Sequence, residues 1–195
     1  GGSFTQATGA TLDGGGALSL SSVNPAVFET AAALGALTLS SATASFATDI
    51  TTQTTVLTLT SSTVNGPGIL TNAAGRVVSL SLGNTINTAV VNAGTLAVGV
   101  GGFSSTSTIT GAFTTVAGSM VRVTSAGSSN STLSVASGFT NHGTIELTKS
   151  EDTFGSSTLA VSSGTLVNAP DGTIRTVAGT GGTRTLNTQL ENQGT

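Results

Sequence analysis

The chain has 195 residues, of which only 7% are charged, and its formal net charge is −3. Soluble domains usually carry about 25% charged residues, so the solvent-facing surface here must be built from hydroxyls and amides. The five basic residues are spread along the chain, which excludes the clustered basic footprint of a nucleic-acid-binding protein. The absence of cysteine excludes disulfides, thiol catalysis and cysteine-based metal sites.

The hydrophobic content is high enough for a core. Hydrophobic residues make up 37% of the chain, and large aliphatic side chains recur every few residues. Disordered segments combine low charge with low hydrophobicity, so we do not expect disorder. No run approaches the ~18 consecutive apolar residues of a membrane span, and we expect no direct membrane span. The chain opens in mid-pattern at Gly1, and we expect the native protein to continue on both sides.

The first third of the chain, residues 1–65, is irregular. Short alternating segments at 36–39, 44–46 and 56–60 are typical of strands. The best helical candidate runs from Pro25 to Leu34, where Asn24 could cap a helix that has proline at its first position. We expect either irregular coils throughout this third or one short helix within them.

Residues 66–195 repeat one phrase: a large apolar residue, one further residue, usually asparagine, a short turn, glycine, a small residue and another apolar residue. The asparagines of the phrase are Asn72, Asn92, Asn141, Asn168 and Asn192, and Thr115 replaces asparagine in a degenerate copy. The glycines are Gly75, Gly94, Gly118, Gly143, Gly172 and Gly194. Their successive spacings are 19, 24, 25, 29 and 22 residues. The phrase is constant while the length varies, so insertions must fall in loops outside a constant core.

Within each repeat the local period is two, and about three short strands fit between successive glycines. Three strands in a coil of roughly 24 residues predict an all-β fold, a right-handed parallel β-helix (β-solenoid) of about eight coils. We interpret residues 1–195 as a single solenoid segment. The glycines would sit at corners, where they can adopt positive φ. A stacked asparagine column would let each amide bond to the next, as in the ladders of stacked sheets.

The copies at 139–147 and 166–174 resemble the repeats of large bacterial surface proteins, including autotransporter passengers and filamentous-haemagglutinin-like adhesins. The resemblance covers roughly residues 65–195 well and the first third loosely. It implies export to the bacterial cell surface and a role in adhesion. The chain shows no recognisable secretion domain or anchor, which departs from the pattern of those families.

Many parallel β-helices cleave polysaccharides, so catalytic groups were sought. Glycosidases need two carboxyl groups about 5–9.5 Å apart. Only Glu151 and Asp152 are adjacent acids, and with Lys149 they are expected in a solvated loop, with a weak ion or glycan site as the alternative. Glu146 and Arg175 each follow a repeat glycine by three residues, which predicts a surface ion pair. The single histidine, His142, is expected to be an exposed turn residue.

We therefore predict no enzyme activity, no cofactor and no metal site. The expected function is a structural or adhesive segment of an extracellular bacterial surface protein, a stiff stalk with a weak multivalent binding surface. Its expected partners are glycans, a host or cell surface, or further copies stacked end to end, and not nucleic acid. A polysaccharide-active enzyme, a phage fibre and an ice-binding protein remain as alternatives. Threonines at 58, 60, 106, 108 and 110 suggest ice binding, but they do not recur at one position of the repeat.

Phenylalanines divide into two groups by their place in the phrase. Phe4, Phe113 and Phe139 occupy the inward anchor position and are expected in the core. Phe103 and Phe154 lie outside the phrase, and exposure is the alternative considered for them.

Overall fold

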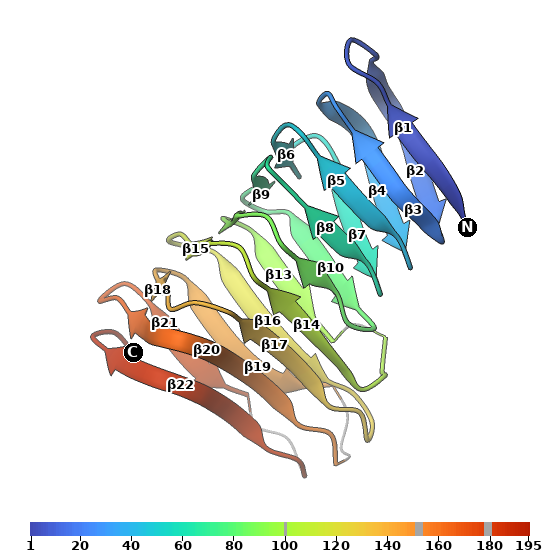
Figure 1. Cartoon of the computed structure of the whole chain (residues 1–195). Coiled ribbons are helices and arrows are strands. Elements are labelled where there is room, and N and C mark those ends of the chain that lie inside the picture. Colours follow the sequence, from blue (N-terminus) through green and yellow to red (C-terminus); the bar gives the residue numbers. More distant parts are fainter. Residues whose placement is uncertain (100, 151–153, 178–180) are drawn as a thin grey trace.

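The computed structural model describes residues 1–99, 101–150, 154–177 and 181–195. These residues form strands, turns and bends and contain no helix. Parallel sheets stack into a β-solenoid of about eight turns, and the chain advances steadily from one end of the stack to the other (Figure 1). The fold class expected from the repeat is confirmed.

Three sheets form the walls of the solenoid. Sheet A contains β1 (Gly2–Gln6), β3 (Val23–Phe28), β5 (Thr43–Phe46), β8 (Thr63–Asn65), β11 (Thr85–Ile86), β14 (Ser105–Ile109), β17 (Ser131–Val135), β20 (Ser157–Asn168), β22 (Arg184–Asn192) and β18 (Thr140–Asn141). Sheet B contains β2 (Leu12–Ser21), β4 (Ala32–Ser40), β7 (Val56–Thr60), β10 (Val77–Ser81), β13 (Thr95–Val98), β16 (Met120–Ser125), β19 (Thr144–Lys149) and β21 (Thr173–Thr176). Sheet C contains β6 (Ile50–Thr51), β9 (Leu70–Asn72), β12 (Val90–Asn92) and β15 (Phe113–Thr115).

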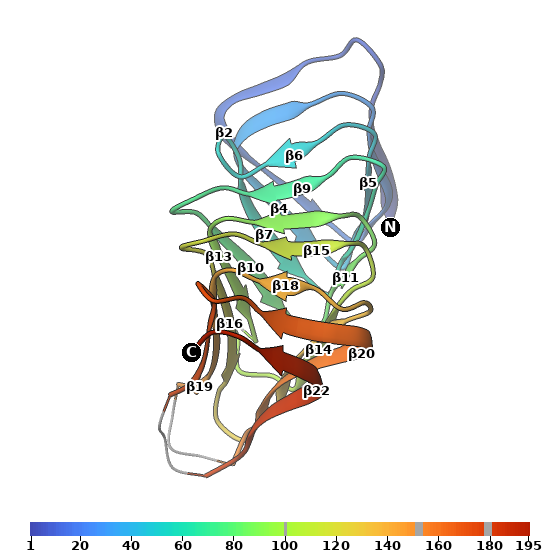
Figure 2. The ribbon, with the colours of Figure 1, turned by 90° about the vertical axis from the view of Figure 1, so that its left-hand side faces the viewer.

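A full turn runs along sheet A, then sheet C, then sheet B. The short sheet C strands lie crosswise between the two larger walls and stack on one another (Figure 2). Towards the C-terminus this wall merges with sheet A, because β20 pairs with β17 through its first half and with β18 through its second half. The first two turns, β1–β2 and β3–β4, contain no sheet C strand among the described residues. The expectation of three strands in every coil is therefore wrong for these two turns.

The helix considered for residues 25–34 is also wrong. The segment falls in β3 and β4, and β3 alternates between the core and the surface. Ala26 and Phe28 are fully buried. Phe28 stacks on Phe46 in the next turn with ring centroids 4.5 Å apart. Inward stacking against a neighbouring turn therefore overrides the local capping signal, as packing often overrides propensity in strands.

The core consists of like side chains stacked on like. One continuous column on sheet B contains Leu20, Leu39, Leu59, Leu80, Val98, Val123 and Leu147, paired in register from turn to turn. Every member of this column is buried. Phe113 and Phe139 are buried too and meet edge to face with centroids 4.9 Å apart, whereas Phe4 is partly buried against the core. Burying such side chains contributes about 1.5–3 kcal/mol each, so the narrow core is a major source of stability.

The corner from sheet B to sheet A changes character along the stack. In the first four turns it is tight, and a single residue with positive φ reverses the chain at Ser22, Ser41, Ser61 and Leu82. In the last four turns a loop of several residues connects the two strands; the described parts of these loops lie between β13 and β14, β16 and β17, β19 and β20, and β21 and β22. The variable length of the repeat is therefore accommodated at this corner.

The repeat glycines serve two different physical needs. Gly75 and Gly118 have φ of 72° and 79°, as expected for corner glycines. Gly94 does not have positive φ, and a Cβ there would lie 2.3 Å from the Arg76 carbonyl oxygen and 2.4 Å from that of Ala73. Gly143, Gly172 and Gly194 are likewise closely approached by the preceding turn. For these four positions the expectation of positive φ is wrong, and the reason for glycine is close stacking of backbones.

Candidate functional site

A buried polar column runs along the corner that follows sheet C. Its members occupy the same register position in successive turns: Thr52, Asn72, Asn92, Thr115, Asn141, Asn168 and Asn192. All but Asn192 are buried, with between 0% and 1% of the residue surface exposed. A buried amide without a partner costs a few kcal/mol, so each of these side chains needs a hydrogen bond.

The neighbouring turns supply those hydrogen bonds. Asn141 Nδ2 donates to Asn168 Oδ1 at 2.8 Å, and Asn168 Nδ2 donates to Asn192 Oδ1 at 2.7 Å. The Thr115 hydroxyl donates to Asn141 Oδ1 at 3.1 Å. Asn141 also accepts the Gly143 N–H at 3.2 Å, which fixes the turn that follows it. Each asparagine thus links the turn above, the turn below and its own corner.

The same ladder is present higher in the stack but is interrupted once. Thr52 donates to Asn72 Oδ1 at 3.0 Å, and Asn72 Nδ2 donates to Asn92 Oδ1 at 2.7 Å. Asn92 Nδ2 turns instead to the Met120 carbonyl at 2.9 Å, because the next rung is Thr115, whose hydroxyl is committed to the turn below. The degenerate copy of the repeat is therefore the point where the side-chain ladder divides into two runs.

An ionic cluster lies on the outer face of sheet B. Arg122, Glu146 and Arg175 stack in register on β16, β19 and β21. Glu146 accepts Arg122 Nε at 2.6 Å through Oε1, and accepts Arg175 Nε at 2.9 Å and Nη2 at 2.6 Å through Oε2. The predicted pairing of Glu146 with Arg175 is confirmed. Its description as a surface pair is wrong for the carboxylate, because only 5% of the Glu146 side chain is exposed.

The two guanidinium groups control the ionisation of Glu146. Burial of the carboxylate raises its pKa, but the hydrogen bonds and positive charges of Arg175 and Arg122 outweigh burial and hold the pKa of Glu146 below its ordinary value of 4.5. The cluster unites one carboxylate with two cations and no second acid. This arrangement suits an anchor between three turns better than the paired carboxyl groups of glycoside hydrolysis.

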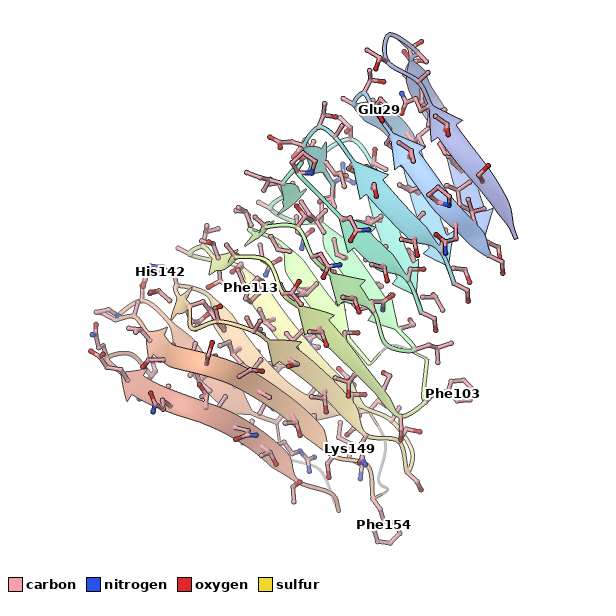
Figure 3. The ribbon with its side chains drawn as sticks, viewed as in Figure 1. Glu29, Phe103, Phe113, His142, Lys149 and Phe154 are labelled. Carbon is pink, nitrogen blue, oxygen red and sulfur yellow. The ribbon has the colours of Figure 1, made fainter. Side chains whose placement is uncertain are left out.

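The remaining sequence candidates lie apart from one another. His142 lies on the edge opposite Phe103 and Phe154 (Figure 3), with 45% of its side chain exposed, and its Nδ1 lies 2.8 Å from Asp171 Oδ1 in the next turn. Lys149 Nζ donates to the Gly181 carbonyl at 3.5 Å. Glu151 and Asp152 lie outside the described residues.

Two exposed aromatic residues lie at the loop edge. Phe103 and Phe154 project from the loop-bearing corner between sheets B and A (Figure 3), with 65% and 83% of their surface exposed. Their place outside the repeat phrase was the signal for this exposure.

Sequence reasoning missed three features. Arg122 was not expected beside Glu146, because its copy of the repeat is degenerate and places it four residues after Gly118 rather than three. A second ladder of side-chain to main-chain hydrogen bonds joins the loops through Ser104, Asn130, Ser156 and Thr183. Threonines also recur at one outward position of sheet A, contrary to expectation: Thr106, Thr132, Thr158 and Thr185 pair in register across four turns.

Comparisons with known proteins add no assignment. No family model, curated protein or solved structure matches the chain. Among the described residues no group of three or more histidine, aspartate or glutamate side chains is placed to hold a metal ion. The part of the chain that the structure describes also contains no helix long and apolar enough to cross a membrane.

The asparagine ladder predicts a large cost for removing one rung. Asn141→Ala deletes the bonds to Thr115, Asn168 and Gly143 and leaves buried partners unsatisfied. We expect the free energy of unfolding, measured by urea denaturation, to fall by about 3 kcal/mol. The matched control is Asn187→Ala on the exposed face of β22, which should change stability by less than about 0.5 kcal/mol. Equal effects of the two substitutions would show that the buried amides do not hold the turns together.

The ionic cluster predicts a pH-dependent contribution to stability. Because the folded-state pKa of Glu146 is lowered, its contribution is present above the ordinary value of 4.5 and is lost as pH falls through the lowered folded-state pKa. At pH 7, Glu146→Gln should lower the free energy of unfolding by about 1–2 kcal/mol, and the difference from the wild type should shrink on acidification. Glu29→Gln, at an exposed position, is the control. A difference that stays constant with pH would contradict this assignment.

Proposed function

We propose that this chain is a structural and adhesive segment of an extracellular bacterial surface protein, acting as a stiff stalk with a weak multivalent binding surface. The observation that carries the proposal is the continuous axial stacking of about eight turns, joined by backbone ladders and by the buried asparagine ladder. At about 4.8 Å per turn the stack is roughly 40 Å long. Such a stack resists bending because bending would separate hydrogen-bonded turns on one side.

The surface chemistry supports weak adhesion. The outward positions of sheet A carry hydroxyls and amides in repeated rows, among them Thr63, Thr85, Thr108 and Ser134. A single neutral hydrogen bond contributes only about 0.5–1.5 kcal/mol net in water. Many such contacts engaged together raise the apparent affinity by orders of magnitude through effective concentration. Glycans, cell surfaces and further copies of the chain are the proposed partners, and a bacterial cell surface is the proposed location.

This function predicts that retention on a surface depends steeply on the number of chains engaged. Beads carrying the chain at graded densities would be washed over surfaces coated with insoluble polysaccharide. We expect retention to rise more steeply than linearly with density, while the soluble monomer binds with a Kd of roughly millimolar or weaker. Retention that is absent at every density, or proportional to density as for one tight site, would contradict the proposal.

The same preparation separates adhesion from catalysis. Polysaccharide incubated with the soluble chain would be assayed for new reducing ends and for unsaturated products, and we expect neither above a heat-unfolded control. Product release by the wild type that Glu146→Gln abolishes would overturn the proposal in favour of a polysaccharide-active enzyme.

A further inference from the structure

The outer face of sheet A in the last four turns carries a polar hollow. Ser104, Ser105 and Thr106 line it from one turn, and Asn130 and Thr132 line it from the next. All five side chains are neutral, and all can exchange hydrogen bonds with a ligand. The hollow adjoins the loop that carries Phe103, which projects from the same edge of the sheet (Figure 3).

The framework of the hollow is fixed by bonds between turns. The Asn130 N–H donates to Ser104 Oγ at 2.9 Å, and the Ser156 N–H donates to Asn130 Oδ1 at 2.8 Å. The Thr183 N–H continues the series to Ser156 Oγ at 3.0 Å. These bonds hold the loop ends in register before any ligand arrives. A prearranged site loses less conformational entropy on binding than a mobile one.

The hydroxyls that face the hollow remain available. Within the described parts of the chain, the hydroxyls of Thr106 and Thr132 make no hydrogen bond to another residue, and neither does Asn130 Nδ2. Thr106 and Thr132 begin the row that continues through Thr158 and Thr185. The same donor and acceptor therefore repeats about every 4.8 Å along the axis of the solenoid.

We propose that this row and hollow bind a neutral, linear β-1,4-linked polysaccharide whose chain runs parallel to the solenoid axis. This inference rests on the proposed adhesive function and names its ligand class. A polymer of hydroxyl-bearing units matches a row of neutral hydroxyls, and one sugar ring is about as long as the spacing between turns. Phe103 offers an apolar ring at the margin, in keeping with binding sites that combine aromatic side chains with a few placed polar groups.

Other partners fit this surface less well. A nucleic acid needs clustered cations, and the hollow has no charged lining residue. A protein partner usually covers an apolar centre rather than rows of hydroxyls. Ice presents a flat lattice plane, whereas this surface is hollowed and bordered by a projecting loop with an exposed phenylalanine.

The test measures binding of cellohexaose and chitohexaose to the soluble chain by NMR titration. We expect at least one hexasaccharide to bind weakly, and Thr106→Val and Thr132→Val each to weaken its affinity about 3- to 10-fold, the effect of one lost hydrogen bond. Phe103→Ala should weaken it by a similar factor. The matched controls are Thr38→Val and Thr58→Val, which pair in register on the outer face of sheet B and should leave the affinity unchanged.

Each contrary outcome identifies what fails. Absence of binding to both hexasaccharides overturns the ligand assignment, as does inhibition of ice recrystallisation that Thr132→Val abolishes. Binding that is equally sensitive to the substitutions on sheets A and B overturns the site. Beads that still show density-dependent retention after Thr106→Val and Thr132→Val would leave the adhesive function standing while removing this site from it.

Discussion

The whole structure depends on stacking each turn in register on the next. At a spacing of about 4.8 Å, a side chain that points inward meets the equivalent side chain of the neighbouring turn. An apolar position must therefore be apolar in every turn, as in the column that includes Leu39, Leu59 and Leu80. A buried polar position must find its partner in its own copy, as Asn141 and Asn168 do.

This constraint separates the interior from the surface. The walls and the polar ladder fix the inward positions, whereas the outward positions need only suit a parallel strand. Glu146 shows that an outward position can still be recruited for stability when cations lie directly above and below it. Elsewhere the outward rows carry hydroxyls that the fold does not require, and this freedom is what allows them to act as a binding surface.

Much of the fold could be predicted because the repeat reports the stacking directly. The recurrence of asparagine two residues after an apolar anchor predicted a column, and the structure places Asn72 and Asn92 in register with a bond of 2.7 Å. The equal offset of Glu146 and Arg175 from their glycines predicted their contact in the same way. Both predictions needed only the assumption that equivalent positions stack.

The remainder depended on register where the phrase is weak. Arg122 and the row from Thr106 to Thr185 could not be aligned, because loops of different length separate them from the nearest glycine. In the first two turns no asparagine phrase marks the corner, so a local capping pattern at Pro25 suggested a helix where Phe28 packs in a strand. Sequence alone did not distinguish glycines needed for positive φ from Gly94, which is needed for close approach.

The most direct test of in-register stacking is a disulfide across two turns beside the asparagine ladder. Thr140→Cys with Val167→Cys places two outward cysteines at paired positions, with Cα atoms about 5 Å apart. The control, Thr140→Cys with Thr165→Cys, shifts one cysteine by two residues and separates the Cα atoms by about 8 Å, beyond the range of an unstrained disulfide. The account predicts rapid intramolecular oxidation of the first pair and little of the second in folded protein. Equal oxidation of both pairs, or preference for the control, would contradict it.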